Sequence, residues 1–487
     1  MEAMDVRFDV FFILLAPLVL ALTFLKTYYT SRLRHLPGPW YSAFTEVVLT
    51  WYTVTGRRIH YIHRLHEIYG PVIRISPNAV CLSDIKAFQE VHRIGSGFLK
   101  SPWYRKFRTA DPSGSIDVFS SIDPRVHGAK RRLLARPFSN TSLRENWEDM
   151  VVNKVKSTID QLKAECKSQG MVDVLKWWTF MTTDMIVQVA FEEDLRMSET
   201  GVKAKFLDDL DMIMMSGGIR AELPWAWALF RALTLGLWDP LQGPDDRLRE
   251  HSQAIMTSLR DRKLNKRNLF FGIQAQEEES STPHSIAYAA YEGQSLIVAG
   301  SGTTAVTLTY LVWAVLKHEE VRRRLEEEVA LLPEGYRDAM LEQLPYLNAV
   351  IQETLRLYGA APGTLPRVNN SAPLDTCGYT IPPGTTVNTQ SWTLHRNPDV
   401  FPEPERFNPD RWLSATSEMK AFFNPFGAGS RTCLGINLAY MELRHSVARF
   451  VRECVGARLA ETMHDEGMKV QQYFLIAPKG AKCSIVL

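Results

Sequence analysis

The sequence predicts a mainly α-helical protein with a small β-sheet, preceded by an apolar N-terminal segment. The stretch Ile286–His318 is apolar and mostly free of helix breakers, and as one helix it would extend about 50 Å at 1.5 Å per residue. A second helical pattern begins directly after Cys433, with its apolar residues mostly on one side. Two short β-type runs, Val72–Ile75 and Ala79–Leu82, are joined by Pro77-Asn78, which is a hairpin signal.

Composition sets broad limits on the protein class. The chain has 487 residues, of which 45% are hydrophobic and 23% charged, so it can bury a large core. The formal net charge of +2 gives no reason to expect a nucleic-acid partner. The six cysteines are scattered without the spacing of a disulfide framework, and we expect the folded part to face a reducing compartment.

The N-terminal segment is interpreted as a membrane anchor. Val10–Leu25 carries no charge, but its 16 residues fall short of the roughly 20 of a usual spanning helix. Flanking apolar residues and the thinner bilayer of the endoplasmic reticulum would allow it to span. A secretory signal peptide is disfavoured because the start is not basic and no A-x-A-like site follows. A buried core helix is the remaining alternative.

Charges around this segment give its orientation. Acidic residues precede it, and Lys26, Arg32 and Arg34 follow it. Basic flanks stay cytoplasmic. We therefore expect residues 1–34 to form a single-pass anchor in the endoplasmic reticulum membrane, with a helix at about 10–25, and residues 35–487 to form a cytosolic domain.

Between the ends, the chain alternates helical patterns with polar, breaker-rich stretches. Glu145–Leu175 and Trp177–Phe191 are predicted helices. Ser101–Asp123 is predicted to be a loop, and Asn265–Ser285 a mobile surface loop.

The residues Phe426–Gly435 read F-G-A-G-S-R-T-C-L-G. Cys433 precedes a predicted helix, where unpaired N–H groups and the helix dipole favour a thiolate. Gly429 and Gly435 have no side chains, so a flat cofactor could lie close to the backbone, and Arg431 could reach an anionic group on it.

Other cysteines limit the kind of metal site. Cys377 and Cys454 do not give the spacing of a zinc or iron–sulfur site, and C-x-x-C-H is absent. A single thiolate suits one axial bond to haem iron, and an inert buried thiol is the alternative.

The ten residues match F-x-x-G-x-R-x-C-x-G at every fixed position, and they resemble the haem-binding loop of the cytochrome P-450 superfamily. The resemblance covers Pro37 to the C-terminus. It implies the family fold as one domain over 35–487, although length alone would suggest about three domains. It also implies haem b with Cys433 as the iron ligand, and Phe426, Arg431 and Gly435 around the cofactor.

A basic segment after residue 125 resembles the family's W-x-x-x-R element, with His127 at the tryptophan position. His127 and Arg131 are spaced i, i+4 and share one helical face. The resemblance implies that both, together with Arg367, donate to the haem propionates, and that Gly363 and Thr364 line the substrate pocket. A solvated basic helix is the alternative for the first two.

Ala299–Thr304, read A-G-S-G-T-T, resembles the family's oxygen-binding pattern A/G-G-x-D/E-T-T. This assigns catalytic roles to Thr303 and Thr304. Gly302 replaces the usual acid, so we expect a water chain held by Thr303, or a substrate hydroxyl, to carry protons. A threonine that bonds only to its own helix is the alternative. Glycines inside a helix each cost about 1 kcal/mol, and close packing or a kink would explain them.

Two further motifs concern folding. Glu353-Thr354-Leu355-Arg356 matches E-x-x-R, and Pro404-Glu405-Arg406-Phe407 matches P-E-R-F. The resemblance assigns Glu353, Arg356 and Arg406 to a buried structural triad. His395 has no second histidine nearby, so we expect a structural role rather than metal binding.

The resemblance implies a monooxygenase that inserts one oxygen atom of O₂ into a lipophilic substrate and releases the other as water. NADPH would supply electrons through a separate membrane-bound reductase, docked on a basic face that includes Lys130, Arg132 and Lys420. The alternatives are a non-oxygenating isomerase or dehydratase, and a haem sensor without turnover. The sequence style resembles filamentous-fungal members that tailor secondary metabolites.

Overall fold

The computed structural model describes residue 19 and residues 21–107, 116–234, 243–260, 269–270 and 286–487. Helices dominate. They are η1 (Trp40–Ala43), α2 (Val47–Val54), α3 (Arg58–Tyr69), α4 (Ile85–His92), α5 (Trp103–Phe107), α6 (Pro124–Ala135), α7 (Asn140–Asn146), α8 (Glu148–Gln169), α9 (Val174–Phe191), α10 (Met197–Thr200), α11 (Leu207–Glu222), α12 (Pro224–Leu233), α13 (Gly243–Arg260), α15 (Ile286–Lys317), α16 (Glu319–Ala330), α17 (Asp338–Leu341), α18 (Pro345–Tyr358), α19 (Ser391–Leu394), α20 (Asp410–Leu413), α21 (Ser417–Phe422), η2 (Gly429–Arg431), α22 (Ile436–Glu453) and α23 (Asp465–Met468).

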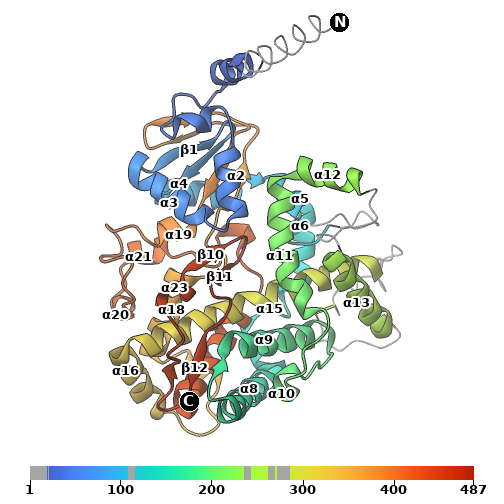
Figure 1. Ribbon diagram of the computed structural model, residues 1–487, viewed down its shortest axis with the longest axis vertical. Helices are drawn as coiled ribbons and strands as arrows, with labels where there is room; N and C mark the ends of the chain where they lie inside the picture. The colour runs from blue at the N-terminus through green and yellow to red at the C-terminus, as the bar shows by residue number, and fades with distance from the viewer. Residues whose placement is uncertain (1–18, 20, 108–115, 235–242, 261–268, 271–285) are drawn as a thin grey trace, which may run out of the picture.

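The strands are short. They are β1 (Val72–Ser76), β2 (Ala79–Leu82), β3 (Leu99–Lys100), β4 (Val172–Asp173), β5 (Arg367–Val368), β6 (Leu374–Thr376), β7 (Tyr379–Ile381), β8 (Thr386–Thr389), β9 (Arg458–Leu459), β10 (Val470–Gln472), β11 (Ile476–Pro478) and β12 (Ser484–Val486). The largest sheet has the order β1-β2-β8-β5-β3, and β1 and β2 form the predicted antiparallel hairpin. It lies toward the N-terminal end of the molecule (Figure 1). A mainly helical fold with a small sheet is confirmed.

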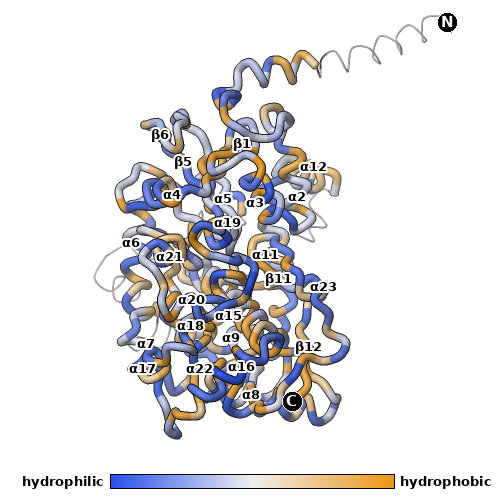
Figure 2. The backbone as a smooth tube through the Cα atoms, turned by 90° about the vertical axis from the view of Figure 1, so that its left-hand side faces the viewer, coloured by the Kyte–Doolittle hydropathy of each residue, from blue (hydrophilic) through white to orange (hydrophobic). Residues whose placement is uncertain are grey.

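Helix α15 crosses the middle of the molecule (Figure 1), and the other helices pack around it. It covers nearly the whole predicted stretch. Among the described residues, Tyr288–Lys317 is the one helix long and apolar enough to span a membrane, and 72% of its most apolar window is buried inside the protein. Hydrophilic segments such as α16 lie at the periphery (Figure 2). The length and apolarity of α15 therefore reflect a place in the core.

Helices α9 and α15 approach each other closely because α15 has glycines at the contact. A Cβ atom on Gly300 would lie 2.4 Å from Ile186 Cγ1, and one on Gly293 would lie 2.4 Å from Phe191 Cζ. Any larger residue at either position would have to displace α9. Close packing, one of the two explanations expected for the α15 glycines, thus applies at Gly300.

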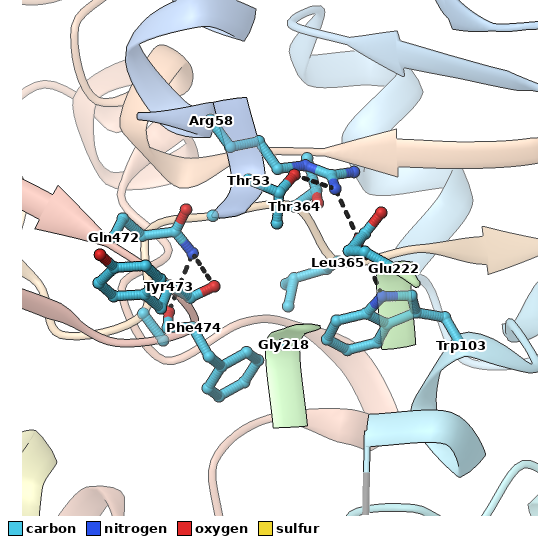
Figure 3. A pocket seen from close by; sticks show the side chains of 12 residues that line it. Thr53, Arg58, Trp103, Gly218, Glu222, Thr364, Leu365, Gln472, Tyr473 and Phe474 are labelled. Atoms are coloured by element: carbon cyan, nitrogen blue, oxygen red, sulfur yellow. Dashed lines mark hydrogen bonds and ion pairs between the residues drawn. The ribbon is translucent and has the colours of Figure 1, made fainter. Parts of the chain in front are cut away.

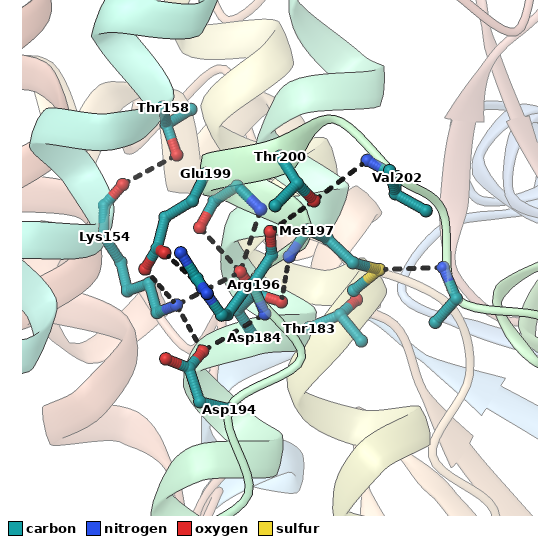
Figure 4. Close-up of polar contacts among 12 residues, drawn as sticks. Lys154, Thr158, Thr183, Asp184, Asp194, Arg196, Met197, Glu199, Thr200 and Val202 are labelled. Carbon is teal, nitrogen blue, oxygen red and sulfur yellow. Dashed lines mark hydrogen bonds and ion pairs between the residues drawn. The ribbon is translucent and has the colours of Figure 1, made fainter.

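A buried ion cluster fixes the end of α9 against α8 and α10 (Figure 4). The Lys154 ammonium, with 4% of its side chain exposed, lies 2.6 Å from Asp194, 3.0 Å from Glu199 and 3.5 Å from Asp184. The Asp184 carboxylate also accepts hydrogen bonds from the backbone N–H groups of Met197 and Ser198. Because every charge has a partner, the cluster holds the helix that supports α15.

The predicted structural triad forms around Glu353, but with a different second arginine. Glu353 is fully buried and pairs with Arg356 at 2.8 Å, as expected, and with Arg411 of α20 at 3.1 Å. It also accepts hydrogen bonds from Trp412 Nε1 and the Asn408 N–H. Arg406 was the wrong assignment: its guanidinium is 63% exposed and pairs with Glu403, because only the backbone carbonyl of Arg406 faces the cluster.

His395 connects this cluster to the segment before Cys433. Arg356 donates to the His395 carbonyl at 2.8 Å, and the His395 Nε2 accepts the Asn424 N–H at 2.9 Å. Burial lowers the pKa of His395 to about 3, so the ring is neutral and can accept. Its expected structural role is confirmed.

Several boundaries differ from the predictions. Ser101–Asp123 is not wholly a loop, because α5 forms within it and is stabilised by packing of Tyr104 and Phe107, both buried. The predicted helix Glu145–Leu175 ends at Gln169, where Gly170 takes a left-handed conformation with φ of 79° before β4 begins. The predicted loop Asn265–Ser285 and the predicted anchor helix at about 10–25 lie largely outside the described residues.

The two arginines give a matched test of the corrected triad. Arg411→Leu removes one charged hydrogen-bond donor from a buried carboxylate and should destabilise the protein by about 1.5–3 kcal/mol. Arg406→Leu should change stability by less than about 0.5 kcal/mol, as surface substitutions usually do. Urea unfolding of both variants would measure this, and equal losses would contradict the assignment of Arg411.

Candidate functional site

The loop around Cys433 is closed by backbone contacts. The Cys433 N–H donates to the Phe426 carbonyl at 2.9 Å, and the Phe426 ring lies against Tyr440 of α22 with centroids 5.3 Å apart. Gly429 has φ of +65°, and a Cβ there would lie 1.9 Å from the His92 carbonyl oxygen. A glycine is therefore required at 429. The loop presents Cys433 immediately before α22, as predicted.

The Cys433 thiol is exposed, yet protein atoms surround its sulfur closely enough that burial raises its pKa. The Gly435 backbone N–H, which hydrogen-bonds the sulfur, and the Arg131 charge act in the opposite direction, but more weakly. The predicted preference for a thiolate is thus wrong for the protein by itself, since desolvation outweighs the helix terminus. A metal cation bonded to the sulfur would displace the proton.

Basic side chains converge beside this loop from four parts of the chain. They are Lys100, His127, Arg131, Arg367 and Arg431. Arg367, Lys100 and His127 are at most 7% exposed. Among the described residues, none of the five forms an ion pair with a carboxylate, and Arg367 Nε has no hydrogen-bond partner. Sequence reasoning missed Lys100, which stands in a short strand with no motif around it.

The electrostatics of this basic cluster show that its cationic groups disfavour one another's charge, and that Asp117 and Asp123 oppose this only in part. Burial lowers the pKa of His127 to about 3, and the charges of Arg431, Lys100, Arg131 and Arg367 lower it further. Burial and the Arg367 charge lower the pKa of Arg431 to about 10. Buried charges are costly without counter-ions. The cluster therefore fits an anionic group, and the two carboxylates of haem beside a thiol ligand meet that requirement.

Two predicted propionate donors already have protein partners. Arg131 donates to the Thr432 carbonyl at 2.7 Å. Arg431 donates to the Ser121 carbonyl at 2.7 Å and the Ile122 carbonyl at 3.1 Å. These bonds tie α6 and residues 116–122 to the Cys433 loop. The structure thus brings the predicted residues together, and Arg367 retains the most free hydrogen-bonding capacity.

The α15 segment that carries Gly302 is partly open. Ala299 is exposed, and Gly302 and Thr303 are half-buried. The Thr303 hydroxyl donates to the Ala299 carbonyl at 2.9 Å, so the bond to its own helix is present, and its remaining lone pairs are free to accept. Thr304 is buried. It points away from this open part, toward a carboxyl group of α22.

That carboxyl belongs to Glu442, which is 2% exposed and hydrogen-bonds the Thr304 side chain. Burial raises the pKa of Glu442 to about 8, and the Thr304 hydroxyl opposes this only in part. The sequence contained a signal for it, because an acid stands among the apolar positions of a predicted helix, four residues after Leu438.

A second acid, Glu292, pairs with Lys130, which was predicted to belong to the basic face that docks the reductase. The Lys130 ammonium lies 3.4 Å from the fully buried Glu292 carboxylate, and its side chain is 15% exposed. Glu292 also accepts the Val118 N–H at 3.1 Å, and burial together with the Asp117 charge raises its pKa to about 7. Lys130 therefore holds residues 116–122 rather than forming part of a docking face.

A cavity lies between the sheet end of the molecule and α11 (Figure 3). Its lining includes Gly363 and Thr364, which the resemblance placed in the substrate pocket, together with Trp103 and Phe474. At its edge, the Glu222 carboxylate accepts from Arg58 at 2.7 Å and from Trp103 Nε1 at 3.0 Å. The rings of Trp103, Phe107, Phe119 and Phe474 pack together with centroids 4.7–6.3 Å apart.

Comparison with known proteins decides the family. A family profile described as Cytochrome P450 matches residues 37–479. The chain belongs to the cytochrome P450 family. It is 39% identical over 471 residues to the cytochrome P450 monooxygenase stcB of Emericella nidulans, covering 94% of this chain and 89% of that protein. It is also 39% identical to the cytochrome P450 monooxygenase tazI of Aspergillus terreus, covering 96% of each chain.

A more distant relative is the methylphloroacetophenone oxidase of Cladonia uncialis, 32% identical over 400 residues that cover 78% of this chain and 86% of that protein. The chain is thus a cytochrome P450 monooxygenase. The family carries a haem whose iron is bound by a cysteine thiolate, and the exposed thiol and the basic cluster fit that cofactor.

The protonated Glu442 predicts a pH dependence of stability. Its pKa is raised from 4.5 to about 8 in the folded protein, so between these values the unfolded chain has lost a proton that the native state keeps. Stability should fall as pH rises through this window, by up to about 1.4 kcal/mol per pH unit from this group. Glu442→Gln should flatten the dependence in urea unfolding from pH 5 to pH 8. The exposed Glu418→Gln serves as the control, and an unchanged slope in Glu442→Gln would contradict a protonated Glu442.

Proposed function

We propose that this cytochrome P450 binds haem b through Cys433 and oxidises a lipophilic small molecule in fungal secondary metabolism. The observation that carries the proposal is the exposed Cys433 thiol beside a basic cluster that forms no ion pair with a carboxylate among the described residues. The haem supplies the oxygen chemistry when bound, and a thiolate ligand favours O–O cleavage. The protein binds the haem, orients the substrate and excludes water from the site.

In this proposal Arg367, Lys100 and His127 bind the haem propionates. Arg367 and Lys100 are buried nitrogen donors, and the neutral His127 ring can donate one hydrogen bond. Arg131 and Arg431 keep their backbone bonds and add positive potential. Phe426 and Gly435 flank the sulfur: a Cβ on Gly435 would meet no atom within 4 Å, which leaves room for a flat group.

The substrate is proposed to be apolar and to contain aromatic rings. The cavity wall carries Trp103 and Phe474, with Phe107 packed behind them, and aromatic pairs contribute beyond their buried area. A relative named for oxidation of methylphloroacetophenone, an aromatic ketone, is consistent with this class. The fungal origin of the relatives supports a tailoring step in secondary metabolism.

Thr303 is proposed to hold a water that delivers protons, since Gly302 has no side chain to donate. The Thr303 hydroxyl donates to Ala299 and so presents its lone pairs to the open part of α15. A water there would donate to Thr303 and receive its own proton from a neighbouring water or a substrate hydroxyl. Thr304 is bonded to Glu442 on the buried side of α15 and supports the helix.

Electrons are proposed to come from NADPH through a separate reductase. Arg132 of α6 and Lys420 of α21 are exposed and remain available as docking charges, whereas Lys130 is committed to Glu292. Exposed charges steer encounter more than they add affinity.

Membrane attachment is proposed for the N-terminal end. Residues 21–30 are helical and project from the body (Figure 1), with Leu22 57% and Leu25 52% exposed. Trp40 is 76% exposed and Trp51 59% exposed, so further large apolar side chains near this end of the chain face solvent. Together with the predicted anchor helix at about 10–25, these residues support a single-pass protein of the endoplasmic reticulum with a cytosolic domain.

The iron ligand can be tested directly. Cys433→Ser should abolish the red-shifted absorption band of the ferrous carbon monoxide complex, because an alcohol does not replace the thiolate. Wild-type protein with reductase should consume NADPH in the presence of substrate. Haem binding without NADPH use would instead favour the isomerase, dehydratase or sensor, and a retained band in Cys433→Ser would exclude Cys433 as the ligand.

Membrane attachment can be tested by removing residues 1–34. The truncated protein should bind haem but move from the membrane fraction to the soluble fraction, because the apolar N-terminal segment is gone. A Trp40→Ser/Trp51→Ser variant of the truncated protein controls for the remaining apolar surface. Extraction of full-length protein by carbonate alone would contradict a spanning anchor.

A further inference from the structure

The central helix α15 shows a regular series of hydroxyl–carbonyl bonds around the site. Ser301 donates to the Ile297 carbonyl at 2.7 Å and Thr303 to the Ala299 carbonyl at 2.9 Å. Further along, Thr307 donates to the Thr303 carbonyl at 2.9 Å and Thr309 to the Ala305 carbonyl at 2.8 Å. Each of these carbonyls thus accepts two hydrogen bonds, one from the main chain of the helix and one from the hydroxyl four residues later.

One carbonyl in this alternating series has no such donor in its own helix. The Ser301 carbonyl would need a hydroxyl at position 305, and residue 305 is alanine. The donor comes instead from α9: the Thr182 hydroxyl lies 2.6 Å from the Ser301 carbonyl oxygen. Thr182 is fully buried, so no water competes for this bond.

The Thr182 proton has three possible acceptors. The carbonyls of Trp178 and Thr179 in α9 itself lie 2.9 Å and 3.4 Å away, against 2.6 Å for Ser301. A hydroxyl carries one proton, and the bond across the two helices is the shortest. Thr182 and Ile186 are spaced i, i+4 on one face of α9, and Ile186 is the residue that requires Gly300.

We infer that Thr182 is a positioning residue that sets the path of α15 beside Thr303. A hydroxyl bonded to a helix carbonyl competes with the main-chain hydrogen bond at that carbonyl, and within a helix such bonds often bend it. The Ser301 carbonyl lies on the buried side of α15, between Gly300 and Gly302, and neither glycine has a side chain that could stiffen the backbone there. Thr182 therefore controls, from α9, the backbone that directs the Thr303 hydroxyl.

The inference rests on the proposed haem site, and carbon monoxide bound to reduced haem gives a readout other than turnover. The infrared C–O stretch senses hydroxyl groups near the ligand. Thr182→Val keeps the shape but loses the donor, so the C–O band should shift or broaden, and peroxide released per NADPH consumed should rise about fivefold, the factor that one hydrogen bond represents. Thr182→Ser should behave like the wild type.

Two further variants separate positioning from stability. Thr158→Val removes a matched buried hydroxyl, bonded to the Lys154 carbonyl of α8 at 2.8 Å, and should lower the urea midpoint about as much as Thr182→Val while leaving the C–O band unchanged. Thr182→Val/Ala305→Ser restores a donor to the Ser301 carbonyl from within α15, and the band should return toward its wild-type position.

The inference is overturned if Thr182→Val leaves both the C–O band and peroxide release unchanged, or if Thr158→Val shifts the band equally. If the proposed haem site itself were wrong, the wild-type protein would lack the carbon monoxide band of a thiolate-ligated haem, and this result is distinct from either outcome above. A Thr303→Ala variant that leaves peroxide release unchanged, beside a Thr182→Val variant that raises it, would remove the role proposed for Thr303 while confirming that Thr182 controls this segment.

Discussion

The fully buried Glu353 carboxylate is the interaction on which the cysteine loop depends. An ionised carboxylate without partners in the interior would cost far more than any single contact returns. Here Arg356, Arg411, the Trp412 indole and the Asn408 N–H all donate to it. These donors come from α18, from Asn408 just before α20 and from α20 itself, so one buried charge holds together segments that are far apart in the sequence. Arg356 also donates to the His395 carbonyl, and the His395 ring accepts the Asn424 N–H. Asn424 lies two residues before Phe426, so these bonds connect the Glu353 cluster to the cysteine loop.

The basic cluster at the proposed haem site differs from Glu353, because its charged groups are only partly matched by opposite charges of the chain. Within the part of the chain that the structure describes, its basic side chains form no ion pair with a carboxylate, and burial lowers the pKa values of Lys100, Arg367 and Arg431. Such a cluster destabilises the protein until an anion compensates it. The contrast separates two kinds of buried charge in one molecule: Glu353 is satisfied by the chain, and the basic cluster is left for a cofactor.

The elements that the sequence predicted correctly are those whose signals lie within a short stretch of chain. The α15 helix, the β1–β2 hairpin and the Cys433 loop were predictable because their signals lie within short stretches of chain. The choice between Arg406 and Arg411 was not, since both follow Pro404 closely and only the tertiary path shows which side chain reaches Glu353. The thiol pKa was predicted in the wrong direction because helix termini are visible in a sequence and desolvation is not. Thr182 was invisible for a related reason, as its partner is 119 residues away.

Glycine occurs at positions 300 and 302 of α15 for two different structural reasons. Gly300 is fixed by packing, because a Cβ would overlap Ile186 at 2.4 Å, and α9 is anchored by the Lys154 cluster and cannot yield. At Gly302 a Cβ would meet only Leu475 Cδ1, at 3.3 Å, and the end of a leucine side chain can rotate. An acid at 302 is thus not forbidden by backbone packing, but it would press on the residues between β10 and β11, whose Tyr473 and Phe474 line the cavity. Glycine at 302 therefore has two effects: α15 lacks an acid there, and Leu475 can lie against the helix. In the proposed delivery of protons by water or substrate no acid at 302 takes part, so the direction of the Thr303 hydroxyl, and the Thr182 bond proposed to set it, would decide where that water is held.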